Sequence, residues 1–146
     1  MGLKKRLKGA RVYFDTNIFI YMLEGNKELS KPIDILQQGI QSQDFYVHSS
    51  ELVFTEILPP LVRDNKTNII KLTVSFLSKS NVFDLAPIDR DVSIQAGYLR
   101  GQLNMKSPDA LHVATALFQK CDIFLTKDKG IRTPKGLERV ILSDFK

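Results

Sequence analysis

The chain has 146 residues, of which 43% are hydrophobic and 25% are charged, and it carries a formal net charge of +5. This length suits one domain with a single core, and the composition is that of an ordinary globular protein. No apolar run approaches the roughly 20 residues that cross a bilayer, and the N-terminus lacks the apolar stretch of a signal peptide. One cysteine, Cys121, excludes an internal disulfide and fits a reducing compartment. We therefore expect a single cytoplasmic domain over residues 1–146.

The first third of the sequence alternates short strands with helices. Residues 11–14 include aromatic and β-branched residues and predict a strand. A helix over 18–23 follows and stops near Gly25. Pro32 suits the first turn of a second helix over 33–43, and residues 45–48 predict the next strand.

The same alternation continues to the end of the chain. A helix over 51–58 begins after Ser50, and the pair Pro59 and Pro60 should end it or bend it sharply. Ser107 and Pro108 predict a clear helix start, with serine as the N-cap and proline at the first helical position. The other expected elements are helices over 68–77, 89–103 and 109–119, and strands over 82–85, 122–125 and 140–142.

Strands that alternate with helices require crossover connections and a largely parallel sheet. In such sheets ligands bind beyond the carboxyl ends of the strands. Asp15 follows the first strand and Asp128 follows the fourth, so both should lie at that edge. Glu56 and Asp109 belong to helices that can flank it. The order of elements therefore predicts four acids at one edge of the sheet.

Each acid also has an ordinary structural explanation. Asp15 is a good N-cap, and Asp109 in a first helical turn is favoured by the helix dipole. Asp128 could be a turn residue before Gly130. Glu56 shares a helix face with aliphatic residues, where an unpaired acid is costly unless it lies at a solvated rim. Each acid alone is weak evidence for a functional site, and the four together are stronger evidence.

Four neighbouring carboxylates repel one another, and a divalent cation reverses that repulsion. Mg²⁺ and Mn²⁺ prefer oxygen ligands and bind through few carboxylates together with substrate phosphate. Asn17 and Thr126 are near enough in the sequence to orient ligands or waters around such an ion. His112 is expected to pack in its helix, although a metal or proton-transfer role stays open, and His48 is given no role.

Basic residues are clustered and not evenly spread. Such clusters attract polyanions such as RNA, although solvated lysines can simply keep a protein soluble. One cluster opens the chain, and the other surrounds Asp128: Lys4, Lys5, Arg6, Lys8 and Arg11, then Lys127, Lys129, Arg132 and Lys135.

Four segments, in order, resemble the PIN-domain family of metal-dependent ribonucleases, which includes VapC-type toxins. They are VYFDTNIFIYML, SSELVFTEIL, SPDALHVATAL and IFLTKDKGI, and the resemblance runs from about Val12 to Leu142. It implies an α/β/α three-layer sandwich around a mostly parallel five-stranded sheet. It also implies Mg²⁺ or Mn²⁺ held by the acids, dimers and, for the toxins, a small antitoxin that blocks the site.

The family's acids fall on Asp15, Glu56, Asp109 and Asp128 of this chain. Lys127 stands where the family commonly has a small polar residue, which makes Asp128 the least secure of the four. Together with Lys129 and Arg132, Lys127 is the expected contact for substrate phosphate.

The leading hypothesis is therefore a metal-dependent endoribonuclease, plausible as the toxin of a toxin–antitoxin pair. A non-catalytic PIN-like module that binds RNA or protein is the main alternative. A haloacid-dehalogenase-type phosphatase also begins with an aspartate after a strand. That chemistry requires a second aspartate two residues on, where this chain has Asn17.

Overall fold

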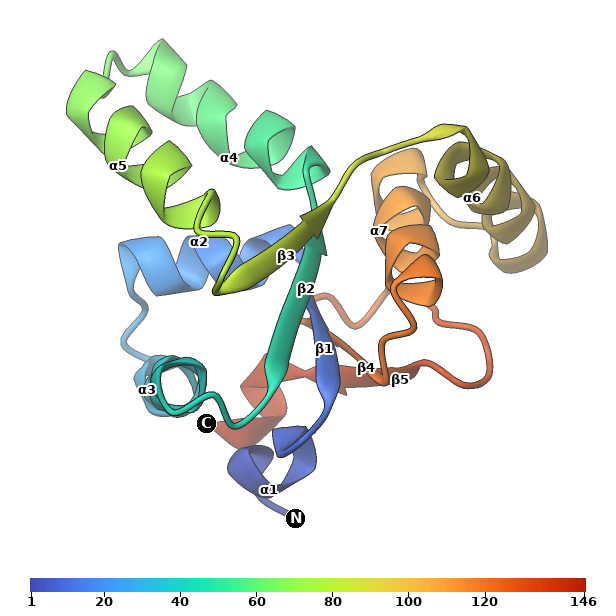
Figure 1. Cartoon of the computed structure of the whole chain (residues 1–146), viewed down its shortest axis with the longest axis horizontal. Coiled ribbons are helices and arrows are strands. Elements are labelled where there is room, and N and C mark those ends of the chain that lie inside the picture. Colours follow the sequence, from blue (N-terminus) through green and yellow to red (C-terminus); the bar gives the residue numbers. More distant parts are fainter.

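The computed structural model describes all 146 residues and contains one sheet of five parallel strands (Figure 1). The strand order is β3-β2-β1-β4-β5. The strands are β1 (Arg11–Phe14), β2 (Tyr46–Ser50), β3 (Phe83–Ala86), β4 (Ile123–Thr126) and β5 (Glu138–Ile141).

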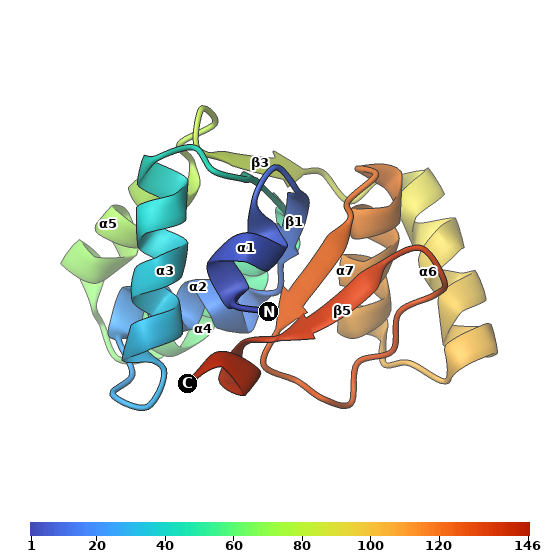
Figure 2. The same cartoon turned by 90° about the horizontal axis from the view of Figure 1, so that it is seen from below.

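Helices cover both faces of the sheet, so the predicted α/β/α sandwich with a five-stranded parallel sheet is confirmed (Figure 2). The first five helices lie on one face, and α6 and α7 lie on the other. The helices are α1 (Leu3–Leu7), α2 (Thr16–Glu24), α3 (Ser30–Gln41), α4 (Leu52–Arg63), α5 (Thr67–Leu77), α6 (Arg90–Leu103) and α7 (Ser107–Phe118), and a short 3-10 helix, η1 (Leu142–Phe145), ends the chain. No helix has both the length and the apolar character needed to span a membrane.

The central strand β1 feeds two separate cores because its side chains alternate between the faces. Val12 and Phe14 pack into a cluster of 19 buried residues on the α1–α5 side. Tyr13 points the other way, into a cluster of 12 buried residues shared with α6 and α7. This double burial explains why the strand has almost no polar residue until Asp15.

The chain order places a crevice at the end of β1. From β1 the chain moves through β2 to β3 on one side, and it later returns to β4 and β5 on the other side. Ligands of open α/β sheets bind where the order reverses in this way. Asp15 directly follows β1, and Asp128 lies two residues after β4. The fold therefore brings these two acids to the same crevice.

Pro59 and Pro60 do not end α4, because the helix continues through them to Arg63. Proline fixes a backbone angle that a helix accepts, and its cost is one lost hydrogen bond and a local clash. Ile57 and Leu61 pack against the larger core, which offsets that cost.

Two smaller expectations also change. Lys106, not Ser107, occupies the N-cap of α7, and no side chain caps that helix. The sequence patterns did not predict α1 or η1. Both are short, and α1 packs Leu3 and Leu7 into the core although its other residues are basic.

Candidate active site

Asp15 is the best-anchored acid of the chain. It is 5% exposed and serves as the N-cap of α2, where its Oδ1 accepts a hydrogen bond from the backbone N–H of Thr16 at 2.9 Å. Its Oδ2 accepts from Thr126 Oγ1 at 2.7 Å and from Asn17 Nδ2 at 3.1 Å. Asp15 can therefore cap α2 and also belong to the candidate site, because Oδ1 accepts from the helix backbone and Oδ2 accepts from Thr126 of β4.

Asn17 and Thr126 connect α2 to the loop after β4. Asn17 donates to Thr126 Oγ1 at 3.2 Å, and its Oδ1 accepts from the backbone N–H of Lys127 at 3.1 Å. Thr126 Oγ1 also accepts from the backbone N–H of Asp128 at 3.0 Å. These bonds hold the backbone that carries Asp128 against Asp15.

Glu56 reaches the same region from α4, with its side chain 32% exposed. Its Oε1 accepts from Thr16 Oγ1 at 2.8 Å and lies 2.6 Å from Nε2 of His112. Burial by itself would raise the pKa of Glu56, but the hydrogen bonds from His112 and Thr16 reverse the balance and lower it. The carboxylate is therefore held in its charged form.

Sequence reasoning assigned His112 to helix packing, and the structure places it in the middle of the candidate site. It is 1% exposed, contacts Glu56, and has Nε2 3.8 Å from Oδ1 of Asp15. Its Nδ1 lies 2.6 Å from the hydroxyl of Tyr13. The available signal was its position three residues after Asp109, on the helix turn that follows that acid.

Asp109 is half-buried at the start of α7. Burial raises its pKa, and the nearby negative charges of Asp15 and Asp128 raise it further. The charge of His112 acts in the opposite direction but does not cancel this upward shift. Asp109 thus belongs to one group of mutually repelling carboxylates.

Asp128 is the most exposed of the four acids. Its Oδ1 accepts from the backbone N–H of Gly130 at 2.8 Å, as in a turn closed by an aspartate side chain. Asp128 is therefore a turn residue, and its charge also acts on Asp109.

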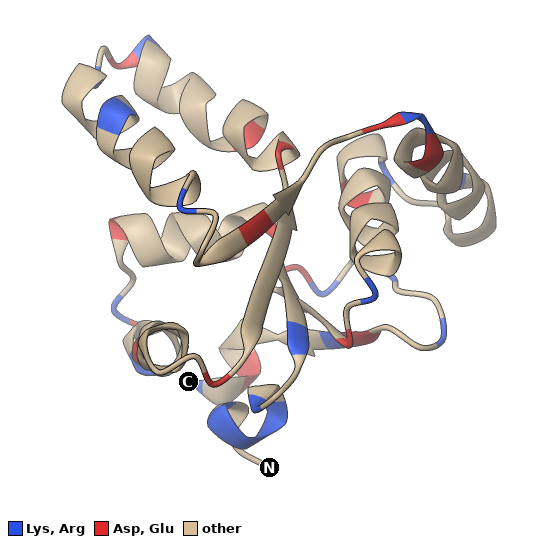
Figure 3. Ribbon diagram, in the orientation of Figure 1, with Lys and Arg blue, Asp and Glu red and all other residues tan.

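Lys127, Lys129 and Arg132 surround this acid on the solvent side. None of the three pairs with a site carboxylate, and the Lys127 ammonium lies 5.3 Å from the ring centre of Tyr21. Figure 3 shows that the basic residues of α1, which belong to the cluster that opens the chain, lie far from the acids of α4 and α7. The three residues near Asp128 in the sequence are all exposed to solvent.

The donor set fits a hard divalent cation in its chemistry. Its ligands would be carboxylate oxygens, which Mg²⁺ prefers, and their mutual repulsion would be relieved by positive charge. No group of three or more His, Cys, Asp or Glu side chains has the geometry of a metal site. Mg²⁺ typically binds through one or two carboxylates and keeps several waters, so a complete protein cage is not required.

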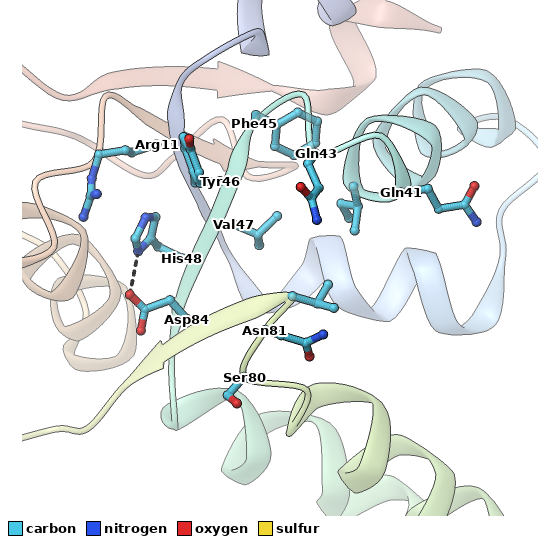
Figure 4. Close-up of a pocket in the computed structure, with 12 residues that line it drawn as sticks. Arg11, Gln41, Gln43, Phe45, Tyr46, Val47, His48, Ser80, Asn81 and Asp84 are labelled. Carbon is cyan, nitrogen blue, oxygen red and sulfur yellow. Dashed lines mark ion pairs between the residues drawn. The ribbon is translucent and has the colours of Figure 1, made fainter.

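A cavity of about 570 Å³ lies at the opposite, amino-terminal edge of the sheet (Figure 4). Its lining includes Arg11, Tyr46, His48 and Asp84, and none of the four predicted acids. His48 is 4% exposed, and its Nδ1 lies 3.2 Å from Oδ2 of Asp84. The contact is poorly directed, and neither ring nitrogen makes a hydrogen bond. Burial, and then the charge of Arg11, lower the pKa of His48.

Several solved structures share the fold of this chain. A toxin–antitoxin complex from Klebsiella pneumoniae is 23% identical, with a TM-score of 0.61 and coverage of 86% of this chain and 94% of that one. The VapBC2 complex from Rickettsia felis, bound to promoter DNA, is 16% identical, with a TM-score of 0.67 and coverage of 90% and 98%. The Sarcin-Ricin loop cleaving toxin VapC20 from Mycobacterium tuberculosis is 15% identical, with a TM-score of 0.61 and coverage of 77% and 86%.

No curated protein sequence matches the chain. The family model for the PIN domain matches residues 12–137, which include all four acids and every strand except the first residue of β1 and the whole of β5. This match covers most of the length of the chain, which is enough to assign the family. The chain belongs to the PIN-domain family.

Proposed function

We propose that this protein is a divalent-metal-dependent endoribonuclease that hydrolyses RNA phosphodiester bonds at the carboxyl edge of its sheet. The observation that carries the proposal is the electrostatic coupling of Asp109 to Asp15 and Asp128, which marks a group of acids strained by like charge. Such a group is stabilised when a cation binds. The nearby basic residues Lys127, Lys129 and Arg132 fit a polyanionic substrate.

Each residue has a role in this proposal. Asp15, Glu56 and Asp109 would hold Mg²⁺ or Mn²⁺, and Asp128 would complete the site or serve a second ion. A bound ion of this kind lowers the pKa of water and stabilises charge on the phosphate oxygens. Asn17 and Thr126 keep Asp15 in place through their hydrogen bonds.

The lysines and Arg132 would hold the RNA backbone by phosphate contacts, which fix position without reading sequence. The exposed placement of all three supports this role, because phosphates must reach them from solvent.

We also propose that the protein acts in the cytoplasm as the toxin of a toxin–antitoxin pair, as a homodimer blocked by a small antitoxin. Support comes from the similar structures, several of which are complexes of toxins with antitoxins. The single buried thiol, Cys121, is compatible with a reducing compartment.

Cleavage of a structured RNA tests the central claim, with wild type compared with Asp15→Asn and Asp109→Asn in Mg²⁺, Mn²⁺ or chelator. We expect cleavage only by wild type with metal, and a loss of at least about 10³-fold in the variants, because each removes charge that a metal site requires. Asp84→Asn, at the opposite edge of the sheet, is the matched control and should retain full activity.

Two outcomes would contradict the proposal. Equal cleavage by wild type and both variants would show that these acids are not needed. RNA binding without cleavage, in either metal, would favour the non-catalytic PIN-like module instead.

A further inference from the structure

A continuous chain of hydrogen bonds runs from the centre of the sheet to the candidate site. The hydroxyl of Tyr13, on β1, lies 2.6 Å from Nδ1 of His112, on α7. Nε2 of the same ring lies 2.6 Å from Oε1 of Glu56, on α4. Tyr13 is fully buried and His112 is 1% exposed, so water does not compete for these bonds.

The direction of the chain follows from which groups can donate. A carboxylate only accepts hydrogen bonds, so the proton between Glu56 and the ring belongs on Nε2. A neutral imidazole with a proton on Nε2 has a lone pair on Nδ1. In that neutral form, the hydroxyl of Tyr13 donates to the lone pair. Each nitrogen of this ring is therefore partnered, in contrast to both nitrogens of His48.

Glu56 receives two donors on one oxygen. His112 and Thr16 both donate to Oε1, and Oε2 makes no hydrogen bond to the protein. Two donors on Oε1 fix the rotation of the carboxylate. Without them a partly exposed glutamate beside other acids would swing away, because like charges repel it.

We propose that His112, held by Tyr13, is a positioning residue that keeps the carboxylate of Glu56 oriented with Oε2 available to the site. The inference rests on the proposed function, since it assigns how one acid of that site is held. His112 acts through Glu56 and touches neither RNA nor metal. Partners that orient a metal-binding side chain typically contribute about 10–100-fold in metal affinity or activity.

Kinetics separate positioning from packing. We expect His112→Leu to lower kcat by about 10–100-fold with little change in the KM for RNA. His112→Gln can still present an N–H to Glu56, so it should recover part of the loss. Tyr13→Phe removes only the outer hydroxyl, leaves the ring in place, and should have a smaller effect.

A matched control and a double variant make the result specific. Thr115→Val removes a buried hydroxyl from the same helix, where it bonds only the backbone oxygen of Leu111, and should leave kcat unchanged. If His112 acts through Glu56, adding His112→Leu to Glu56→Gln should cost nothing further. A fully additive loss in the double variant would overturn the inference.

A second measurement is independent of activity. Long-range ¹H–¹⁵N NMR of the metal-free protein reports which ring nitrogen of a histidine carries a proton, and the chain has only two histidines to assign. We expect a proton on Nε2 of His112 and a shift of that signal in Glu56→Ala. An Nε2 without a proton would overturn the inference.

The two proposals can fail separately. If wild type does not cleave RNA but Nε2 responds to Glu56→Ala, the nuclease proposal fails and the positioning contact stands. If wild type cleaves RNA and folded His112→Leu keeps full kcat, only the positioning role fails.

Discussion

Each edge of the sheet has a buried histidine near an acid, but the hydrogen bonding of the two histidines differs. At the carboxyl edge, a buried histidine has a partner on each ring nitrogen, and the acids around it are tied to named donors. At the amino edge, His48 is equally buried, but neither nitrogen is hydrogen-bonded. The cavity of about 570 Å³ lies at the amino edge, and none of the four predicted acids lines it.

The position of this cavity is therefore a poor guide to where the chemistry of this protein takes place. An RNA phosphate binds at an open, charged surface, which does not require a deep pocket. What marks the carboxyl edge is the convergence of like charges that the fold holds together against their repulsion.

The largest expected effect tests whether the carboxyl edge binds a cation. Mg²⁺ or Mn²⁺ at about 100 times its Kd should stabilise wild type by about 2.7 kcal/mol, or roughly 5–10 °C in Tm for a chain of this size. Thermal unfolding monitored by circular dichroism measures the shift, with NaCl of equal ionic strength as the control. Asp84→Asn should keep the response, and a variant carrying both Asp15→Asn and Asp109→Asn should lose it. A response in that double variant would place the cation elsewhere.

A smaller effect concerns the repulsion itself. In the absence of divalent cations, Asp109→Asn should raise Tm, because the raised pKa shows that the charged form is disfavoured at this position. Asp109 is only half-buried and water screens its charge, so the gain should not exceed about 1 kcal/mol, or roughly 2–4 °C. With Mg²⁺ added, wild type should instead have the higher Tm of the two proteins. A lower Tm for Asp109→Asn without metal would contradict the description of a strained acidic group.

The amino edge should respond to pH instead of metal. The pKa of His48 is lowered in the folded state, so the unfolded chain binds more protons below the ordinary histidine value of about 6.5. The stabilising contribution is therefore present above that pH and is lost as the pH falls through the folded-state pKa. His48→Leu should flatten this part of the pH profile, as measured by urea unfolding between pH 7.5 and pH 5.5.

At pH 7.5 the same variant should be neutral or slightly more stable. Replacing a buried ring that lacks partners with an apolar side chain removes an unsatisfied polar group. An unchanged slope in His48→Leu would show that other groups control stability in this range.

The strands and most helices could be predicted from local patterns, because burial on both faces leaves runs of apolar residues and caps leave polar ones. Asp89 shows this clearly, since its side chain caps α6 by accepting from the backbone N–H of Val92. Pro59 and Pro60 show the limit, since tertiary contacts of Ile57 and Leu61 hold α4 together through them. Neither residue type nor spacing reports such contacts.

The roles of the four acids are still predictions, and their neighbours show why sequence alone was insufficient. Asp15, Asn17 and Thr126 could be grouped in advance because α2 follows β1 directly and parallel strands end at one edge. The ring of His112 could not be grouped with Tyr13 and Glu56, which are 99 and 56 residues away along the chain.

Local periodicity and chain order in the sequence were enough to predict the alternation of strands and helices, and four ordered segments were enough to indicate the family. The tertiary structure was needed to show that His112 is held between Tyr13 and Glu56, while neither ring nitrogen of His48 makes a hydrogen bond. Hydrogen bonds depend on distances of a few tenths of an ångström, and the packing of α4 and α7 against β1 sets those distances.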